Sequence, residues 1–368
     1  MKFRFGIEHE VAFIRPDGQF ADFANTAFAE FESIVSELPI YEEDYPQLRV
    51  GDAGIKLKRW YVEGFERFAT TGEVIDCPPK GIEIRTTVQE SIEETLAQLK
   101  ESFAQLRAAA ENMGFSPALT SFHPYRCEFV PDPPLNAFEQ QRRQGSPEMQ
   151  TAHIPMLTQG PDLNLSANGL SPSQLVDIGR KLTYYSPFMI PFSYSSPFYR
   201  GNPWKGLSVR TFFRTGARPA AMVFLNDTVD LLDSIPSLTQ LARIPAEAGR
   251  IEFKAFDSCG DFDLYGSLLC LLKGLILDET LTGRATVPEA KLHQQSAQLG
   301  FADEQIYAGA WDVLKAAYAA TTRATEWNRL DRLKDMLQRR YSPAHNMLNA
   351  YKRGQPINHI LQQEYLSV

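Results

Sequence analysis

Alternation of apolar and polar residues marks several short segments of this chain as β-strands. Side chains two positions apart lie on the same face of a strand, so each such segment has one apolar and one polar face. The segments with this pattern are residues 5–14 (FGIEHEVAFI), 81–87 (GIEIRTT), 162–166 (DLNLS) and 250–256 (RIEFKAF). We expect strands there, and further strands at residues 208–213 (SVRTFF) and 220–225 (AAMVFL).

A second period, with apolar residues three and four positions apart, predicts helices. It is clearest over residues 92–113, where Gly114 supplies the end. Another helix begins at residues 171–172, a Ser-Pro pair, and is expected to break at residues 186–187, a second Ser-Pro pair. From Leu264 onward we expect only helices, and over residues 115–160 a long irregular surface loop. Strands and helices mix without a regular βαβ alternation, which favours an α+β fold with an antiparallel sheet.

Composition narrows the class of protein. The chain has 368 residues, enough for one large domain or two ordinary ones, and a net charge of −8, which argues against nucleic acid or an anionic membrane as the main partner. The longest apolar stretch, Leu264 to Leu277, is interrupted by Lys273, and no signal-peptide pattern precedes the first strand. The four cysteines are scattered, so we expect a reduced, cytoplasmic protein without a cysteine-based zinc site.

The polar faces of the strands carry mainly acids and amides. Glu8 with Glu10 and Asp162 with Asn164 are same-face pairs, and Glu83 and Glu252 each sit inside an alternation. If these strands share one sheet, one face becomes a floor of oxygen ligands suited to Mg²⁺ or Mn²⁺. The alternative is a set of independent amphipathic strands with a solvated outer face, which is common in antiparallel sheets.

Two cations accompany the acids. Arg85 is two residues after Glu83, and Lys254 is two residues after Glu252, so each shares a face with its acid. They can form ordinary ion pairs, or they can lie beside an anionic substrate held by metals. His9 points to the opposite face, and we expect it to be packed in the core rather than to bind a ligand. The usual glycine-rich phosphate loops and the G-x-S-x-G motif are absent, so a bound nucleotide would have to be held through metals.

Four patches, in order, resemble the second family of glutamate–cysteine ligases, carboxylate–amine ligases of the glutamine synthetase-like superfamily. They are FGIEHE (residues 5–10), GIEIRTT (81–87), YYSPFMIPFSYSSPFYRG (184–201) and RIEFKAFDSCGDFDLYGSLL (250–269). The resemblance covers about residues 3–280. It implies a single domain over 1–368, with a curved antiparallel sheet forming a funnel, helices on its convex side, and a helical C-terminal part over about 281–368.

The resemblance also implies an activity. ATP and Mg²⁺, or Mn²⁺, would activate a carboxylate, most simply the side-chain carboxylate of glutamate, as an acyl phosphate, and an amine, most simply that of cysteine, would displace phosphate. The partners would be small amino acids, with no nucleic acid and no membrane, and the possibility of a homo-oligomer stays open. A ligase for another amino acid and amine, or a silent ATP- and metal-binding relative with a regulatory role, remains an alternative.

By the same resemblance, several residues acquire roles. The expected metal ligands are Glu8, Glu10, Glu83, Glu252, Asp162, Asn164 and Asp76. The expected nucleotide contacts are Glu8, Glu83 and Lys254, and the expected catalytic cations are Lys254, Arg210 and Arg85. Two positions depart from the family pattern, because Asp162 and Asn164 stand where histidines are usual and Lys254 stands where arginine is common. These departures put the metal preference and the substrate contact in question.

Overall fold

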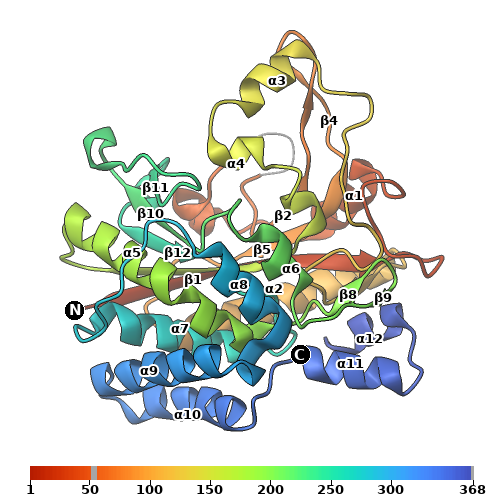
Figure 1. The fold of residues 1–368 in the computed structure, drawn as a ribbon. Helices are drawn as coiled ribbons and strands as arrows, with labels where there is room; N and C mark the ends of the chain where they lie inside the picture. Colours follow the sequence, from red (N-terminus) through yellow and green to blue (C-terminus); the bar gives the residue numbers. More distant parts are fainter. Residues whose placement is uncertain (51–55, 366–368) are drawn as a thin grey trace.

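The computed structural model describes residues 1–50 and 56–365, and an eight-stranded sheet runs through its middle (Figure 1). In spatial order its strands are β11 (Thr239–Leu241), β10 (Ala221–Leu225), β12 (Arg250–Phe253), β7 (Pro161–Ala167), β1 (Phe3–Ile14), β5 (Pro79–Arg85) and β2 (Trp60–Gly64), with β6 (Ser116–Ala118) paired to one end of β1. Neighbouring strands are antiparallel except at the edge, where β11 runs parallel to β10. The predicted α+β fold is therefore confirmed, with one parallel pair that the sequence did not indicate.

The long strand β1 separates the two faces of the sheet. Its odd-numbered residues from Phe3 to Phe13 are buried, while Glu8 and Glu10 point to the other face. Three helices cover the apolar face: α2 (Ile92–Asn112), α5 (Pro172–Met189) and α7 (Phe262–Leu277). Burial of each large apolar side chain here contributes about 1.5–3 kcal/mol, so the helices fix which face of β1 remains open.

His9 is the polar exception on the buried face. Its side chain is fully buried, with Nδ1 2.9 Å from the Tyr265 hydroxyl and Nε2 2.8 Å from the Tyr365 hydroxyl. The Tyr265 hydroxyl also accepts a hydrogen bond from the Cys259 amide, which ties the ring to the loop before α7. Burial lowers the pKa of His9 to about 3, which keeps the ring neutral. The prediction that His9 is packed rather than a ligand is confirmed.

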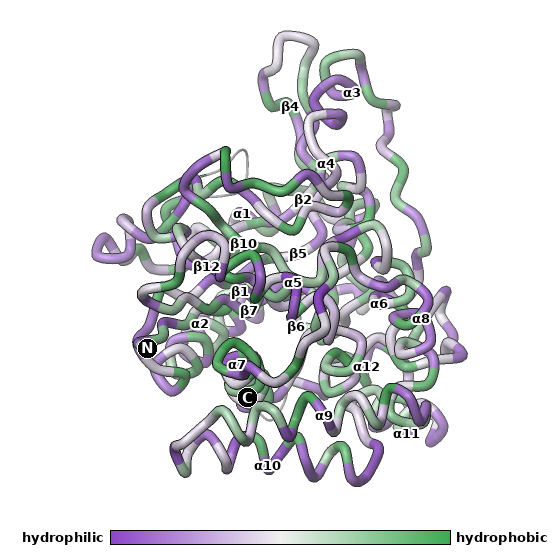
Figure 2. The backbone as a smooth tube through the Cα atoms, turned by 60° about the vertical axis from the view of Figure 1, so that its left-hand side comes forward, coloured by the Kyte–Doolittle hydropathy of each residue, from purple (hydrophilic) through white to green (hydrophobic). Residues whose placement is uncertain are grey.

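The remaining helices form a second layer beneath α7 and around the ends of the sheet. They are α1 (Phe28–Glu37), α8 (Ala290–Leu299), α9 (Glu304–Ala320), α10 (Ala324–Gln338), α11 (Ala344–Lys352) and α12 (Ile357–Gln363). α7 is hydrophobic along most of its length, whereas α10 alternates between hydrophobic and hydrophilic residues (Figure 2). One hydrophobic core accordingly includes residues from both ends of the described chain, such as Phe3 and Tyr365. None of the described helices combines the length and the apolar character that a membrane span requires.

Three local expectations are corrected. Residues 208–213 form not a strand but the short helix α6 (Val209–Arg214), because the Ser208 hydroxyl caps its start by accepting a hydrogen bond from the Thr211 amide. α5 runs through Pro187 to Met189 rather than breaking at residues 186–187. The region expected to be irregular contains two helices, α3 (Ala137–Arg143) and α4 (Pro147–Gln150).

An arm projects from the polar face of the sheet, at the top of Figure 1. It joins α3 to the hairpin of β3 (Arg67–Phe68) and β4 (Val74–Asp76), which is inserted between β2 and β5. A second small hairpin, β8 (Phe198–Tyr199) with β9 (Asn202–Pro203), lies near α11 and α12. The arm matters for function because α4 and the end of α3 reach back over the open face of the sheet.

Candidate active site

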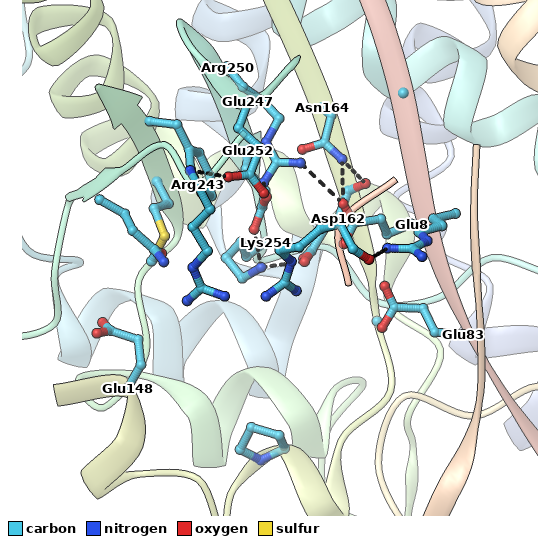
Figure 3. Close-up of a pocket in the computed structure, with 18 of the residues that line it drawn as sticks. Glu8, Glu83, Glu148, Asp162, Asn164, Arg243, Glu247, Arg250, Glu252 and Lys254 are labelled. Atoms are coloured by element: carbon cyan, nitrogen blue, oxygen red, sulfur yellow. Dashed lines mark hydrogen bonds and ion pairs between the residues drawn. The ribbon is translucent and has the colours of Figure 1, made fainter. Parts of the chain in front are cut away.

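A cavity of about 750 Å³ lies on the open face of the sheet, beneath α4 (Figure 3). Its size is within the range of small-molecule sites, about 300–1,000 Å³. Five adjacent strands line it with acids or amides: Glu63 from β2, Glu83 from β5, Glu8 and Glu10 from β1, Asp162 and Asn164 from β7, and Glu252 from β12. All the acids and the amide that the alternation predicted on this face therefore lie in one cavity.

Strand register brings these side chains together in facing pairs. Glu10 lies opposite Glu83, Glu8 opposite Asp162, and Glu252 opposite Asn164. Directly opposed residues have Cβ atoms about 4.5–5.5 Å apart. Opposed carboxylates at that distance repel each other, so the arrangement needs compensating cations.

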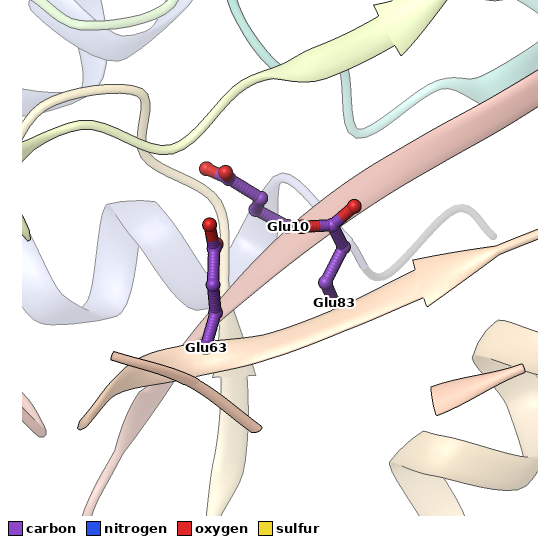
Figure 4. A group of neighbouring side chains, drawn as sticks. All are labelled: Glu10, Glu63 and Glu83. Carbon is purple, nitrogen blue, oxygen red and sulfur yellow. The ribbon is translucent and has the colours of Figure 1, made fainter. Parts of the chain in front are cut away.

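The first acid cluster consists of Glu10, Glu63 and Glu83, whose carboxylate oxygens lie within 4.8 Å of one another (Figure 4). Lys80 is buried beside it, with Nζ 2.8 Å from Glu10 Oε1 and 2.8 Å from Glu63 Oε2. The Gly160 amide donates to Glu10 Oε2 at 2.9 Å. One ammonium thus pairs with two of the three carboxylates.

Glu83 is the carboxylate that this ammonium does not reach. It is 5% exposed, and among residues 1–50 and 56–365 it has no hydrogen-bond or ion-pair partner. Burial and then the carboxylates of Glu63 and Glu8 raise its pKa well above the ordinary value. Burial and Glu63 likewise raise the pKa of Glu10 to about 7. The first acid cluster therefore has surplus negative charge and free oxygen ligands, which is the donor set preferred by Mg²⁺ and Mn²⁺.

The second acid cluster consists of Glu8, Asp162 and Glu252, and it is compensated more completely. Lys254 forms ion pairs with Asp162 and Glu252, and Arg250 contacts Glu252 Oε2 at 2.8 Å and Glu8 Oε1 at 3.3 Å. Burial alone would raise the pKa of Glu252, but Lys254 and Arg250 lower it to about 2. Asp162 has only Lys254, and burial raises its pKa to about 7.

Asn164 lies at the edge of this second cluster. Its Nδ2 donates to Glu8 Oε1 at 3.3 Å, and its Oδ1 is buried without a hydrogen-bond partner in the described part of the chain. The side chain therefore orients Glu8 and leaves one amide oxygen available beside it.

Three arginines at four-residue spacing form the opposite, basic wall of the cavity. They are Arg210, Arg214 and Arg218, carried by α6 and the turn after it. Burial and the charges of the other two lower the pKa of Arg214 well below its ordinary value. Arg214 donates to the Pro219 carbonyl at 2.8 Å and Arg218 to the Glu148 carbonyl at 2.9 Å, so only part of each guanidinium is used. An anion bound beside these arginines would offset their mutual repulsion.

Asp257 fixes the position of this wall. It is fully buried and accepts hydrogen bonds from the Ser196 hydroxyl at 2.7 Å, the Ser208 hydroxyl at 3.0 Å and the Ser195 amide at 3.0 Å. Because Ser208 also caps α6, the carboxylate ties the turn around residues 193–201 to the start of that helix. The serine-rich turn noted in the sequence is thus a support for the arginines.

The predicted catalytic cations occupy different surroundings. Arg210 directs its guanidinium onto backbone carbonyls, at 2.9 Å from Lys254 O and 2.7 Å from Phe256 O. Arg85 donates to the carbonyls of Arg49, at 2.9 Å, and Lys58, at 3.0 Å. Both line the cavity, but these guanidiniums brace its walls. Only Lys254 among the three contacts the acid clusters.

Asp76, a predicted metal ligand, is not part of the cavity. It lies on β4 in the arm, is exposed, and accepts a hydrogen bond from the Cys77 amide at 2.8 Å. β2, which pairs with β5, supplies Glu63 instead. The β3–β4 hairpin is inserted between these two paired strands and carries Asp76 away.

Five other cavity residues were not predicted from the sequence. Glu63 had a usable signal, since it ends the alternating segment WYVEG of β2. Lys80, Arg250 and the pair Arg214 and Arg218 had weaker signals, because basic residues near strand and helix ends are common on ordinary surfaces.

Comparison with known proteins supports this architecture. The family model described as glutamate–cysteine ligase family 2 matches residues 4–215, more than half of the chain. A solved glutamate–cysteine ligase from Francisella tularensis in complex with AMP matches with a TM-score of 0.56 and 10% identity, over 100% of this chain and 90% of that one. At this identity the match shows a shared fold, a curled sheet backed by helices.

Two further solved structures match with lower TM-scores. The complex of the ubiquitin-like protein Pup with its ligase PafA has a TM-score of 0.48 and 11% identity, over 100% of this chain and 69% of that one. GmaS without ligand has a TM-score of 0.41 and 16% identity, over 90% of this chain and 70% of that one. No curated protein sequence is significantly similar to the chain.

Proposed function

The chain belongs to glutamate–cysteine ligase family 2, and from this premise we propose that it is an ATP-dependent carboxylate–amine ligase. The observation that carries the proposal is the cavity in which acids from five strands face a wall of arginines. An acid surface that binds divalent cations and a basic surface that binds anions are both needed to bring a triphosphate and a carboxylate together. In its most specific form, the proposal is that the side-chain carboxylate of glutamate is activated and that cysteine supplies the amine.

The first acid cluster fits a divalent metal. Glu83 is buried and unpaired, and the oxygens of Glu10 and Glu63 lie beside it. We assign these three residues to holding Mg²⁺ or Mn²⁺, with Glu8, Asp162, Asn164 and Glu252 flanking the nucleotide phosphates. When bound, the metal offsets the charge of the triphosphate and polarises its terminal phosphoryl group.

The arginine wall would hold the acidic substrate. Arg214 and Arg218 each keep unused guanidinium nitrogens toward the cavity, and planar guanidinium groups bind carboxylates and phosphates through paired hydrogen bonds. Arg250 lies on β12 and Lys254 directly follows that strand, and both line the cavity with the acid clusters and this wall. We therefore place the carboxylate that accepts the phosphoryl group between the two sides.

The proposed reaction has two balanced steps. A substrate carboxylate oxygen attacks the γ-phosphorus of ATP, the bond to the β–γ bridging oxygen breaks, and an acyl phosphate and ADP result. The amine nitrogen then attacks the acyl carbon, phosphate leaves with the C–O bonding electrons, and the amine loses a proton to form the amide. The residues position the reactants and balance charge in both steps.

The ligase unit would cover residues 1–368, since one hydrophobic core includes both Phe3 and Tyr365. Free thiols at Cys77, Cys259 and Cys270 are buried, which supports a cytoplasmic setting. The second candidate function is a ligase for a different amino acid and amine. It is favoured by Lys254, whose ammonium is tied to two carboxylates and cannot grip a substrate carboxylate as an arginine fork would.

Phosphate release tests the proposal. Purified protein with ATP and Mg²⁺ is incubated with pooled amino acids, and the pools are divided until one acid and one amine remain. We expect phosphate release that needs both substrates and is lost in Glu83→Gln but kept in Asp76→Asn, a matched acid-to-amide change outside the cavity. No release with any pool, from protein that binds ATP and metal, would contradict a ligase and favour a silent relative.

A further inference from the structure

Lys254 stands between the carboxylates of Asp162 and Glu252, two residues expected from the sequence to bind metal. We propose that its ammonium permanently takes the place of a divalent metal in the second acid cluster, so that the nucleotide-free protein binds metal only at Glu10, Glu63 and Glu83. The inference rests on the proposed function for its metal chemistry, and it concerns how many metals this chain holds.

The contacts of Lys254 support this assignment. Its side chain is 16% exposed and reaches Asp162 on β7 and Glu252 on β12, the strand that ends just before Lys254 (Figure 3). A lysine side chain is ordinarily charged at neutral pH, and here both of its ion-pair partners hold the ammonium between them.

Charge counting separates the two acid clusters. The second cluster has three carboxylates, Glu8, Asp162 and Glu252, and two cations, Lys254 and Arg250, within ion-pair distance of them. The first cluster has three carboxylates and one cation, Lys80, which contacts Glu10 and Glu63. A divalent ion added to the first cluster neutralises surplus charge, whereas one added to the second must displace a lysine or an arginine.

The carboxylate without an ion-pair partner among the described residues, Glu83, belongs to the first acid cluster, in which acids outnumber cations. Glu83 is 5% exposed and has no protein partner in the described ranges, while its neighbours offer oxygens within 4.8 Å. A buried carboxylate without a partner is costly, and a bound cation removes that cost. In the second cluster, by contrast, each carboxylate already contacts at least one cation.

Lysine suits this role better than the arginine that the family pattern favours. An ammonium is a compact point charge with three donors that can be shared among carboxylates, as a small metal ion is shared. An arginine fork is planar and is suited to two parallel hydrogen bonds with a single carboxylate. The departure at residue 254 and the replacement of histidines by Asp162 and Asn164 then have one explanation, a cluster adapted to an internal ammonium.

Counting bound Mn²⁺ by electron paramagnetic resonance, without nucleotide, tests the inference. We expect one tightly bound Mn²⁺ for the wild type and at least a tenfold loss of affinity in Glu83→Gln. Lys254→Met should bind two, because Asp162 and Glu252 become free ligands. Lys254→Gln keeps one hydrogen-bond donor for these acids, and it should also bind two if the methionine variant does not fold.

Lys273→Met is the matched control. Lys273 is 15% exposed and pairs with Glu326 on the helical side of the molecule. The Lys273→Met variant therefore loses a comparable ion pair, and the cavity is not affected. Its count should stay at one. Two tight Mn²⁺ ions in the wild type, no bound Mn²⁺, or a count of one in folded Lys254→Gln would overturn the inference. If the wild type binds one Mn²⁺ and the Lys254 variant binds two, but the wild type has no ligase activity on any amino-acid pair, the inference stands and the proposed function is refuted.

Discussion

Glu10 and Glu83 lie directly opposite each other across the antiparallel pair of β1 and β5, and of the two only Glu10 forms an ion pair with a residue that the structure describes. Lys80 contacts Glu10 from the same strand that carries Glu83, three residues away, and turns toward Glu10 and Glu63 instead. Two equivalent carboxylates on one sheet face are thereby made different. One is a member of a protein ion pair, and the other is free to bind a ligand.

This difference predicts opposite effects of two like substitutions on stability. Burial and neighbouring carboxylates raise the pKa of Glu83 well above its ordinary value, so folding at neutral pH must hold this acid protonated at a cost in free energy. Glu83→Gln removes that cost, so the free energy of unfolding should stay the same or rise. Glu10→Gln leaves Lys80 with one acid and should lower it by about 1–3 kcal/mol. Urea denaturation in metal-free buffer compares them, and a larger loss in Glu83→Gln than in Glu10→Gln would contradict the assignment.

Glu83→Gln and Glu10→Gln should both weaken the binding of ATP. Each substitution removes one anionic ligand, so we expect the affinity for ATP in the presence of Mg²⁺ to fall at least tenfold, which is about 1.4 kcal/mol. Calorimetry with and without Mg²⁺ measures this, with Asp76→Asn as the unaffected control. Equal ATP affinity in the presence and absence of Mg²⁺ would contradict a metal-held nucleotide.

Arg214 provides a test of the basic wall. Its guanidinium faces Arg218 and the cavity, so Arg214→Gln should raise the KM for the acidic substrate about tenfold or more while changing the KM for ATP little. Arg284→Gln, which breaks a surface ion pair with Asp177, is the control. Steady-state kinetics, with the substrate pair that the phosphate-release assay identifies, measures both KM values. A selective change in the KM for ATP would place the nucleotide at this wall instead.

The arm depends on a buried ion pair between Arg67 of β3 and Glu139 of α3, 2.7 Å apart. The hydrogen bond from Arg67 lowers the pKa of Glu139 to about 2, and the Phe68 amide adds a further hydrogen bond. Glu139→Gln should loosen the arm and speed limited proteolysis within residues 129–150, because a buried guanidinium loses its partner. Unfolding of the sheet should shift little, and equal cleavage rates in both proteins would show that the pair does not hold the arm.

His293 should make the protein sensitive to acid. Burial lowers its pKa to about 4, below the ordinary value of 6.5, so the unfolded chain takes up a proton between these values and the folded protein does not. Stability from this group is present above pH 6.5 and is lost as pH falls toward 4, by about 2 kcal/mol at pH 5. His293→Gln should flatten the decline between pH 7 and 5 in urea denaturation, whereas the surface change His359→Gln should not.

Local sequence pattern by itself determined which residues share a face. Glu8 and Glu10 had to point the same way once their segment was a strand, and the same holds for Asp162 with Asn164 and for Glu252 with Lys254. The long helix over α2 followed from its apolar period for the same reason. These features depend only on residues a few positions apart, and the order of the motifs was enough to indicate the family.

Only the tertiary structure decided which strands became neighbours and in what register. That pairing brought Glu63 beside Glu83 and carried Asp76 away on the inserted hairpin, although Asp76 is closer in the sequence. It also turned residues 209–214 into a helix, because the Ser208 cap is held by buried Asp257, 49 residues further along. The assignment of each cation to its acid is decided in the same way, since electrostatic energy depends on distance in space and on burial, and neither can be read from local periodicity.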